Sequence, residues 1–81
     1  MRLSIPMRVE ELTKNRARCS ALGQVRWVDR TLMTGKSLTV GDYVIVNLGF
    51  VQRRISNEDA MKSYALFSEL QSVMDKSESS S

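Results

Sequence analysis

The clearest apolar run of the chain lies near its middle, in residues 41 to 50 (GDYVIVNLGF). The Gly-Asp pair that opens the run is a turn signal, and Gly49 closes it after a series of β-branched and aromatic residues. Residues 44 to 46 are apolar without alternation, which is typical of a strand covered on both faces. The run therefore predicts a central strand of a small closed sheet, with Asn47 as its one polar side chain.

The residues before this run alternate between apolar and polar positions, the period of a strand with one buried face. Residues 3 to 9 predict a first strand. Because Pro6 cannot donate a ladder hydrogen bond, this strand is expected to lie at an edge or to be irregular, with the first residues accessible. Residues 16 to 21 and 24 to 27 predict two more strands, joined at Gly23 into a hairpin.

Side-chain parity gives the predicted hairpin two different faces. Val25 and Trp27 occupy the apolar parity of their strand, so both are expected to be buried. The arginines occupy the other parity, so Arg16, Arg18 and Arg26 are expected on the solvent-exposed face. The hairpin would then present positive charge to solvent and bury its one tryptophan.

Residues 56 to 75 predict a helix. Ser56 is a good N-cap, Asp59 stands in capping-box register, and Glu58 is favourably placed against the helix dipole. Residues 76 to 81 are Ser-rich and lack apolar anchors, so they are expected to be disordered. At helical spacing the apolar residues form an arc of about half the circumference that packs on the barrel or on a partner: Ala60, Tyr64, Phe67, Leu70 and Met74, with Leu66 and Val73 at its margin.

Short strands separated by glycine-marked turns indicate a mainly β fold, a small barrel of the OB or SH3-like kind. The expected organisation is one domain, with an OB-like barrel in residues 1 to 55 followed by the C-terminal helix. A chain of 81 residues buries only about 60% of its unfolded surface, which leaves little room for an enclosed active site.

Composition narrows the class of protein further. No apolar run approaches the roughly 20 residues that a membrane helix needs, and no secretory leader is recognisable at the start. A single cysteine cannot form an internal disulfide, which favours a reducing, cytoplasmic location. Residues 1 to 55 hold ten Lys and Arg against four Asp and Glu, so the body is basic, whereas residues 56 to 81 are acidic. Such a body attracts acidic proteins or nucleic acid.

Candidate catalytic and metal-binding groups are few. The chain has no histidine, which excludes Ser-His and Cys-His pairs and His-based zinc sites, and its four glycines are too far apart for a phosphate loop. Cys19 lies on the apolar parity of its strand and is expected to be a small buried hydrophobe rather than a reactive thiol. We therefore expect no enzymatic activity and no resident metal.

The basic face leaves one alternative open, single-stranded nucleic-acid binding by an OB-type barrel. That function requires exposed aromatic side chains for base stacking, and few of the five aromatic residues are expected to be exposed. Nucleic acid is therefore the less favoured partner. The other interpretations are a solvated basic face and docking on acidic proteins; the arginines concerned are Arg16, Arg18, Arg26, Arg30, Arg53 and Arg54.

Four blocks of the sequence carry a resemblance to a known family. Residues 41 to 50 resemble GDYVLVHVGFA, the signature strand of the HypC/HupF hydrogenase maturation chaperones. The opening MRLSIP resembles that family's MCLxIP start. Residues 23 to 26 (GQVR) are similar to its GGVRR turn, and residues 55 to 60 (ISNEDA) to its IDEEEA helix entry. The blocks follow in the family's order and cover most of the chain.

The resemblance implies an OB-like barrel with a C-terminal helix and a non-catalytic role in [NiFe]-hydrogenase assembly. The implied partners are a HypD-like iron-sulfur scaffold protein and the precursor of the hydrogenase large subunit, with a transient Fe(CN)2CO fragment as possible cargo. The residues expected to contact partners are Met1, Arg2, Leu3, Ile5, Pro6, Asn47 and Phe50.

Two positions depart from the family pattern. Arg2 stands where the family has a cysteine that binds the iron fragment, and Asn47 stands where it has a histidine. A guanidinium stays protonated and cannot ligate a metal. Three explanations are open: a substitution or sequence error at position 2, a divergent paralogue that binds the same partners without carrying iron, or a contribution from another group such as the thioether of Met1. Loss of the histidine as well favours the paralogue.

Overall fold

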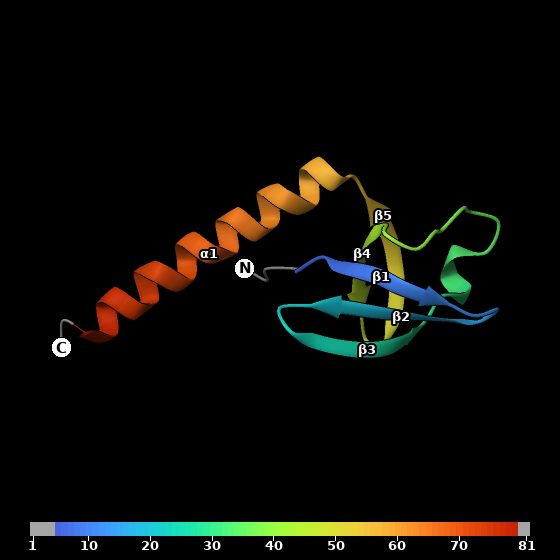
Figure 1. The fold of residues 1–81 in the computed structure, drawn as a ribbon, viewed down its shortest axis with the longest axis horizontal. Coiled ribbons are helices and arrows are strands. Elements are labelled where there is room, and N and C mark those ends of the chain that lie inside the picture. The colour runs from blue at the N-terminus through green and yellow to red at the C-terminus, as the bar shows by residue number, and fades with distance from the viewer. Residues whose placement is uncertain (1–4, 80–81) are drawn as a thin grey trace.

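The structure, a computed structural model, describes residues 5–79, and their side chains as far as residue 73. Five strands close into a barrel in the order β1-β2-β3-β5-β4, and one long helix follows (Figure 1). The predicted mainly β fold, a small OB-like barrel with one C-terminal helix, is confirmed. The elements are β1 (Met7–Leu12), β2 (Arg16–Ala21), β3 (Gln24–Asp29), the 3-10 helix η1 (Thr31–Met33), β4 (Tyr43–Asn47), β5 (Phe50–Ile55) and α1 (Asn57–Ser79).

The apolar run does form the expected central strand. β4 pairs with β1 on one side and with β5 on the other, both antiparallel. Val44, the second residue of this strand, is fully buried. The loop that precedes β4 adds two backbone hydrogen bonds to β1, because Val9 donates to the Asp42 carbonyl and Gly41 donates to the Val9 carbonyl, each at 2.8 Å.

The first strand differs from its predicted position. It begins at Met7, after Pro6, rather than at residue 3. The irregularity that was expected at Pro6 lies instead within the strand, where the register with β2 shifts between Val9 and Glu11. A proline immediately before a strand removes a donor without breaking the ladder, which explains the later start.

The faces of β3 are the reverse of those predicted. Val25 is 60% exposed and Trp27 46% exposed, although both were expected to be buried. The two-residue turn at Leu22 and Gly23 pairs Cys19 with Arg26, and directly paired residues share a face of the sheet. Because Cys19 is buried inside the barrel, Arg26 lies on the same face of the sheet, although its side chain is exposed as predicted.

The barrel core consists of small and medium apolar side chains. Cys19 is part of this core, as expected from its parity. Met33 of η1 and Leu38 of the following loop are also buried, so the segment between β3 and β4 adds to the core as well as connecting the strands. The buried cluster is Val9, Ala17, Cys19, Val28, Met33, Leu38, Val44 and Val51.

The helix begins as predicted and ends later. The Asp59 amide donates to the Ser56 hydroxyl at 3.0 Å, which makes Ser56 the N-cap. The helix continues to Ser79 instead of residue 75, so the predicted boundary is too early. Of the predicted tail, residues 76–79 are helical and residues 80 and 81 lie outside the described part of the chain.

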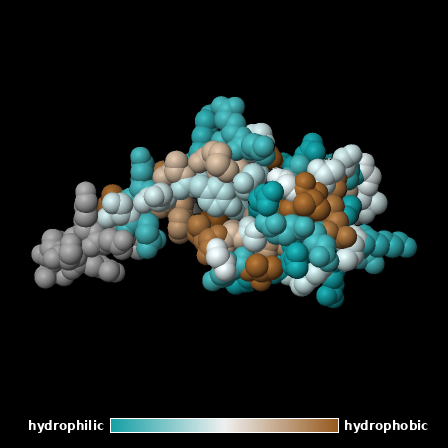
Figure 2. All heavy atoms as spheres, in the orientation of Figure 1, coloured by the Kyte–Doolittle hydropathy of each residue, from teal (hydrophilic) through white to brown (hydrophobic). Residues whose placement is uncertain are grey.

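Only the first turns of α1 pack on the barrel. Ala60 is fully buried and Tyr64 is half-buried, whereas every side chain from 68 to 73 is exposed. The helix projects away from the strands (Figure 1), and apolar atoms remain visible along it (Figure 2). Within residues 5–79, no helix is both long and apolar enough to cross a membrane.

Candidate functional site

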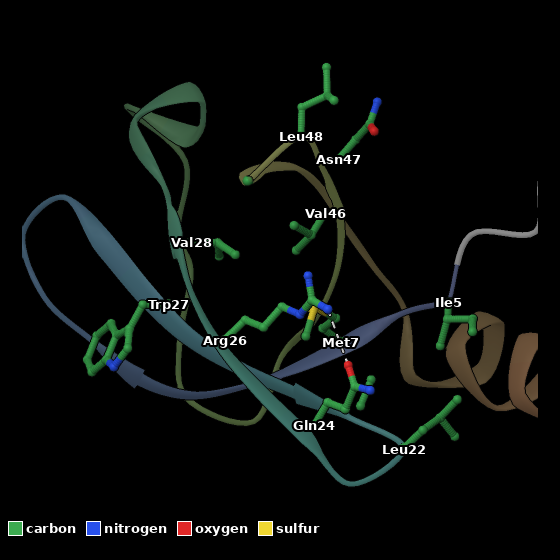
Figure 3. Close-up of a pocket in the computed structure, with 12 residues that line it drawn as sticks. Ile5, Met7, Leu22, Gln24, Arg26, Trp27, Val28, Val46, Asn47 and Leu48 are labelled. Carbon is green, nitrogen blue, oxygen red and sulfur yellow. Dashed lines mark hydrogen bonds between the residues drawn. The ribbon is translucent and has the colours of Figure 1, made fainter.

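A hollow of about 600 Å³ lies beside β3 on the barrel surface and is called the β3 groove (Figure 3). It exists because β3 and β5 are paired only at Asp29 and Phe50. Beyond that point the chain turns away from β3 through Leu48 and Gly49. Ile5, Met7, Leu22, Arg26, Val46 and Leu48 contribute to its lining.

The two hairpin turns at the ends of the groove hold leucines in an unusual backbone conformation. Leu22 has a φ of 52° and Leu48 a φ of 53°, and each is followed by a glycine that is also left-handed. Two consecutive positive φ angles define a type I′ turn, in which Asn, Asp or Gly is the usual first residue. A leucine there costs roughly 1–2 kcal/mol. Both leucine side chains are exposed, Leu48 at 87%.

A strained residue that stays exposed is a reason to look for function, because packing does not account for it. Neither leucine was among the predicted site residues. The signal that would have identified them is the Leu-Gly pair between two strand-like segments, where a two-residue turn requires a positive φ at its first position.

The predicted contact residues are only partly brought together. Ile5 and Asn47 line the β3 groove, and Asn47 is exposed. Phe50 is 37% exposed and lies next to the groove at the start of β5 without lining it. The expected contacts of residues 1 to 3, namely Met1, Arg2 and Leu3, lie outside the described residues.

Pro6 has a different role from the contact role predicted for it. Its side chain is fully buried, and its carbonyl accepts a hydrogen bond from the Tyr64 hydroxyl of α1. The Tyr64 ring packs edge-to-face on Tyr43, with ring centroids 6.1 Å apart. Burial, and to a lesser extent Tyr43, raise the pKa of Tyr64. These contacts fix the segment that leads into the β3 groove against the helix.

Polar chemistry in the groove is provided mainly by Arg26. Among the described residues that line the groove, no other side chain is charged. Its guanidinium donates a 3.3 Å hydrogen bond to the Gln24 side chain (Figure 3). None of the ion pairs found between described residues includes Arg26. The groove is thus an apolar channel with one available positive charge.

A second, smaller hollow of about 420 Å³ lies near η1 and is cationic. Lys36, Arg53 and Arg54 line it together with Met33 and Ser37. Arg54 is also 3.8 Å from the Asp42 carboxylate. This hollow accounts for part of the predicted basic face, and nothing in its lining favours a particular ligand.

Cys19 cannot serve as an accessible thiol ligand. It is fully buried, and burial, with a smaller contribution from Glu10, raises the pKa of its thiol to about 11. A thiol in this environment stays protonated at neutral pH, and the thiolate is the form that binds metals. Within the described residues, no three His, Cys, Asp or Glu side chains gather into a group able to hold a metal ion.

Comparison with known proteins gives the family. The sequence profile of the HupF/HypC family matches residues 1–67, which is most of the chain. The chain belongs to the HupF/HypC family. The resemblance seen in the four sequence blocks is therefore confirmed.

Individual relatives agree with this assignment. The hydrogenase maturation factor HypC of Azotobacter chroococcum mcd 1 is 34% identical over 86% of this chain and 82% of its own length. The protein of the same name from Cupriavidus necator is 38% identical over 90% of this chain and 80% of its own length. That from Helicobacter hepaticus is 32% identical over 96% and 91%. The similarity to HupF/HypC proteins thus spans both the barrel and much of the helix.

Proposed function

We propose that this chain is a non-catalytic assembly chaperone of [NiFe]-hydrogenase maturation. It binds a HypD-like scaffold protein, the precursor of the hydrogenase large subunit, or both in turn. The observation that carries the proposal is family membership over residues 1–67, together with three relatives that are named hydrogenase maturation factors. The cytoplasm, where such precursors are assembled, is the proposed location.

The surface around the β3 groove supports a binding role. Ile5 and Asn47, which belong to two of the four family-like blocks, both line this groove. The buried Pro6 and the Tyr64 hydroxyl hold the entering segment in place. A preformed apolar groove beside an anchored extended segment suits recognition of another protein and needs no catalytic group.

The residues available do not fit the Fe(CN)2CO fragment as cargo held by this chain alone. Position 2 is an arginine, position 47 is an asparagine, and the single cysteine is buried with a raised pKa. A protonated guanidinium has no lone pair to offer iron, and an amide is a poor ligand for this soft, strong-field fragment. We therefore propose that the chain binds assembly partners without carrying the iron fragment itself.

The proposal is tested by affinity purification from the organism's own cells. The tagged chain is expected to recover the hydrogenase large-subunit precursor or the scaffold protein, identified by mass spectrometry. Infrared spectra of the isolated chain are expected to lack CO and CN bands. Recovery of neither protein would contradict the chaperone role, and CO and CN bands on the isolated chain would contradict the absence of cargo.

A matched pair of variants locates the contact surface. Leu48→Asp places a charge on an exposed leucine of the β3 groove, and recovery of the partner should fall. Leu32→Asp makes the same change at an exposed leucine of η1, which does not line the groove, and recovery should stay unchanged. Equal losses with the two variants would show that the groove is not the contact surface.

Single-stranded nucleic-acid binding is a second candidate, favoured by one observation. Trp27 is exposed, and the Arg18 guanidinium lies over its ring, 6.0 Å from the centroid, so one stacking platform is present. Binding of an oligothymidylate would then weaken steeply with salt, with a slope of about 0.7 per phosphate contacted. Absence of binding at low salt would remove this candidate.

A further inference from the structure

One edge of β3 lacks a neighbouring strand over most of its length. β3 is paired with β2 along all six residues, from Gln24 opposite Ala21 to Asp29 opposite Arg16. Its other edge is paired with β5 only at Asp29. Between Gln24 and Val28, no strand in the described part of the chain lies on that edge. This open edge is about 16 Å long and forms one wall of the β3 groove.

The register identifies which backbone groups point into the open edge. In a hairpin with a two-residue turn, the pair that flanks the turn is hydrogen-bonded, and the pairs then alternate along the ladder. Gln24, Arg26 and Val28 therefore bond to β2, whereas the N–H and C=O groups of Val25 and Trp27 point away from it. Asp29 follows the same alternation, because its amide donates across this edge to the Gly49 carbonyl at 2.8 Å.

The side chains around the edge define the chemistry of a segment that could dock there. A strand added to β3 would place alternate side chains over the groove floor, which is apolar at Met7, Val28 and Val46. Arg26 stands over the same floor without a carboxylate partner among the described residues. A carboxylate in the added strand would supply that partner with a charge-assisted hydrogen bond.

We propose that the open edge of β3 binds an extended segment of a partner protein by strand addition. The segment has alternating apolar residues and an Asp or Glu placed against Arg26. Val25 and Trp27 provide the main-chain hydrogen bonds. The exposed leucines of the two type I′ turns lie at the ends of the β3 groove. Strand addition would be the mode of recognition, and it rests on the proposed function, which supplies the protein partner.

The test uses the full chain and a phage-displayed library of random 12-residue peptides as the probe. Selected peptides are expected to be extended, apolar at alternate positions and acidic at one position. Binding should slow hydrogen exchange at the Val25 and Trp27 amides, as measured by NMR. N-methylation of alternate peptide amides should weaken binding about tenfold or more, because each blocked position removes a main-chain hydrogen bond.

Two variants test the edge and the charge separately. Val25→Pro removes a donor that points into the open edge while leaving the β2 ladder intact, so the fold should persist and peptide affinity should fall about tenfold or more. Val25→Ala keeps that donor and should change affinity less than about threefold. Arg26→Glu should weaken acidic peptides about tenfold or more, and Arg26→Lys should restore part of the affinity.

Several results would overturn the inference. One is a set of selected peptides that protect α1 amides instead of Val25 and Trp27. Another is slow exchange of these two amides in the free chain, either in a monomer, where the chain's own segment covers the edge, or in a dimer, where a second copy does. A third is protection by oligothymidylate without any peptide binding. If Val25→Pro disturbs the fold, the N-methylated peptides still decide the question.

Failure of this inference and failure of the proposed function give different results. If the precursor or scaffold is recovered equally by wild type and Val25→Pro, and no peptide protects β3, the chaperone role stands and the strand-addition mode is wrong. If peptides protect β3 and neither hydrogenase protein is recovered, the binding edge stands and the proposed partner is wrong.

Discussion

The barrel closes at two places where strands distant in sequence meet, and the two closures differ. Between β1 and β4 the strand pairing covers two residue pairs, and the loop before β4 extends it with backbone bonds between Val9 and residues 41 and 42. Between β3 and β5 the pairing stops after one residue pair, because the chain turns away at Leu48 and Gly49. One closure is completed by a loop, and the other is left open.

This difference separates stability from binding within one small domain. Beside the completed closure, Val9 and Val44 are fully buried in the core. Beside the open closure, Leu48 and Trp27 stay exposed, and backbone groups of β3 remain available. An open sheet edge with exposed apolar side chains invites pairing with another chain. Proteins therefore protect such an edge unless it serves binding.

The largest effect on stability is expected from a charge introduced beside the completed closure. Val44→Asp buries an unpaired carboxylate in the core and should destabilise the domain by more than about 4 kcal/mol, enough to unfold much of it. Leu48→Asp, on the same hairpin but 87% exposed, should change stability by less than about 1 kcal/mol. Thermal unfolding followed by circular dichroism measures both. Similar losses of stability in the two variants would contradict the separation of a stabilising closure from an open one.

The second largest effect is a loss of domain stability at high pH, through the buried thiol of Cys19. Burial raises the pKa of Cys19 from 9.0 to about 11, so above pH 9 the unfolded chain loses its thiol proton before the folded chain does. Stability that is fully present below pH 9 should therefore fall as the pH rises towards 11, by up to about 3 kcal/mol. Urea unfolding at a series of pH values measures the slope.

Cys19→Ala is the control, because it removes the thiol but keeps the other groups that titrate in this range, including Tyr64. Its stability should fall less steeply between pH 9 and 11 than that of the wild type. Equal slopes in the two proteins would mean that the buried thiol makes no contribution.

The sequence was sufficient to predict the parts of the fold that local rules decide. The apolar run predicted β4, the glycine predicted the turn between β2 and β3, and Ser56 predicted the start of α1. Each of these depends on residues close together in the chain. The family resemblance was equally accessible, because the residues that carry it form short contiguous blocks.

The open closure could not be predicted in the same way. The faces of β3 follow from the pairing of Cys19 with Arg26, and that register depends on a turn length that one glycine alone did not define. The hydrophobic pattern therefore predicted a buried Trp27, whereas its side chain is exposed. The groove itself arises because β5 begins only opposite Asp29, at the end of β3, a tertiary arrangement that no periodicity within either strand encodes.

The smallest expected change in stability comes from replacing the two strained leucines, and it is a stabilisation rather than a loss. Asparagine tolerates a positive φ better than leucine, so Leu22→Asn and Leu48→Asn should each stabilise the domain by about 0.5–1 kcal/mol. Leu32→Asn is the control, because Leu32 is also exposed but is not among the residues with positive φ. Thermal unfolding should show higher midpoints for the first two variants alone.

The same two variants should bind partner peptides less tightly, because each removes apolar surface from a border of the β3 groove. A gain in stability that accompanies a loss of binding is the expected result where strain is retained for function. Stabilisation without any loss of affinity would show that the leucines do not contact the partner. No stabilisation relative to Leu32→Asn would show that surrounding contacts already offset the cost of the left-handed backbone.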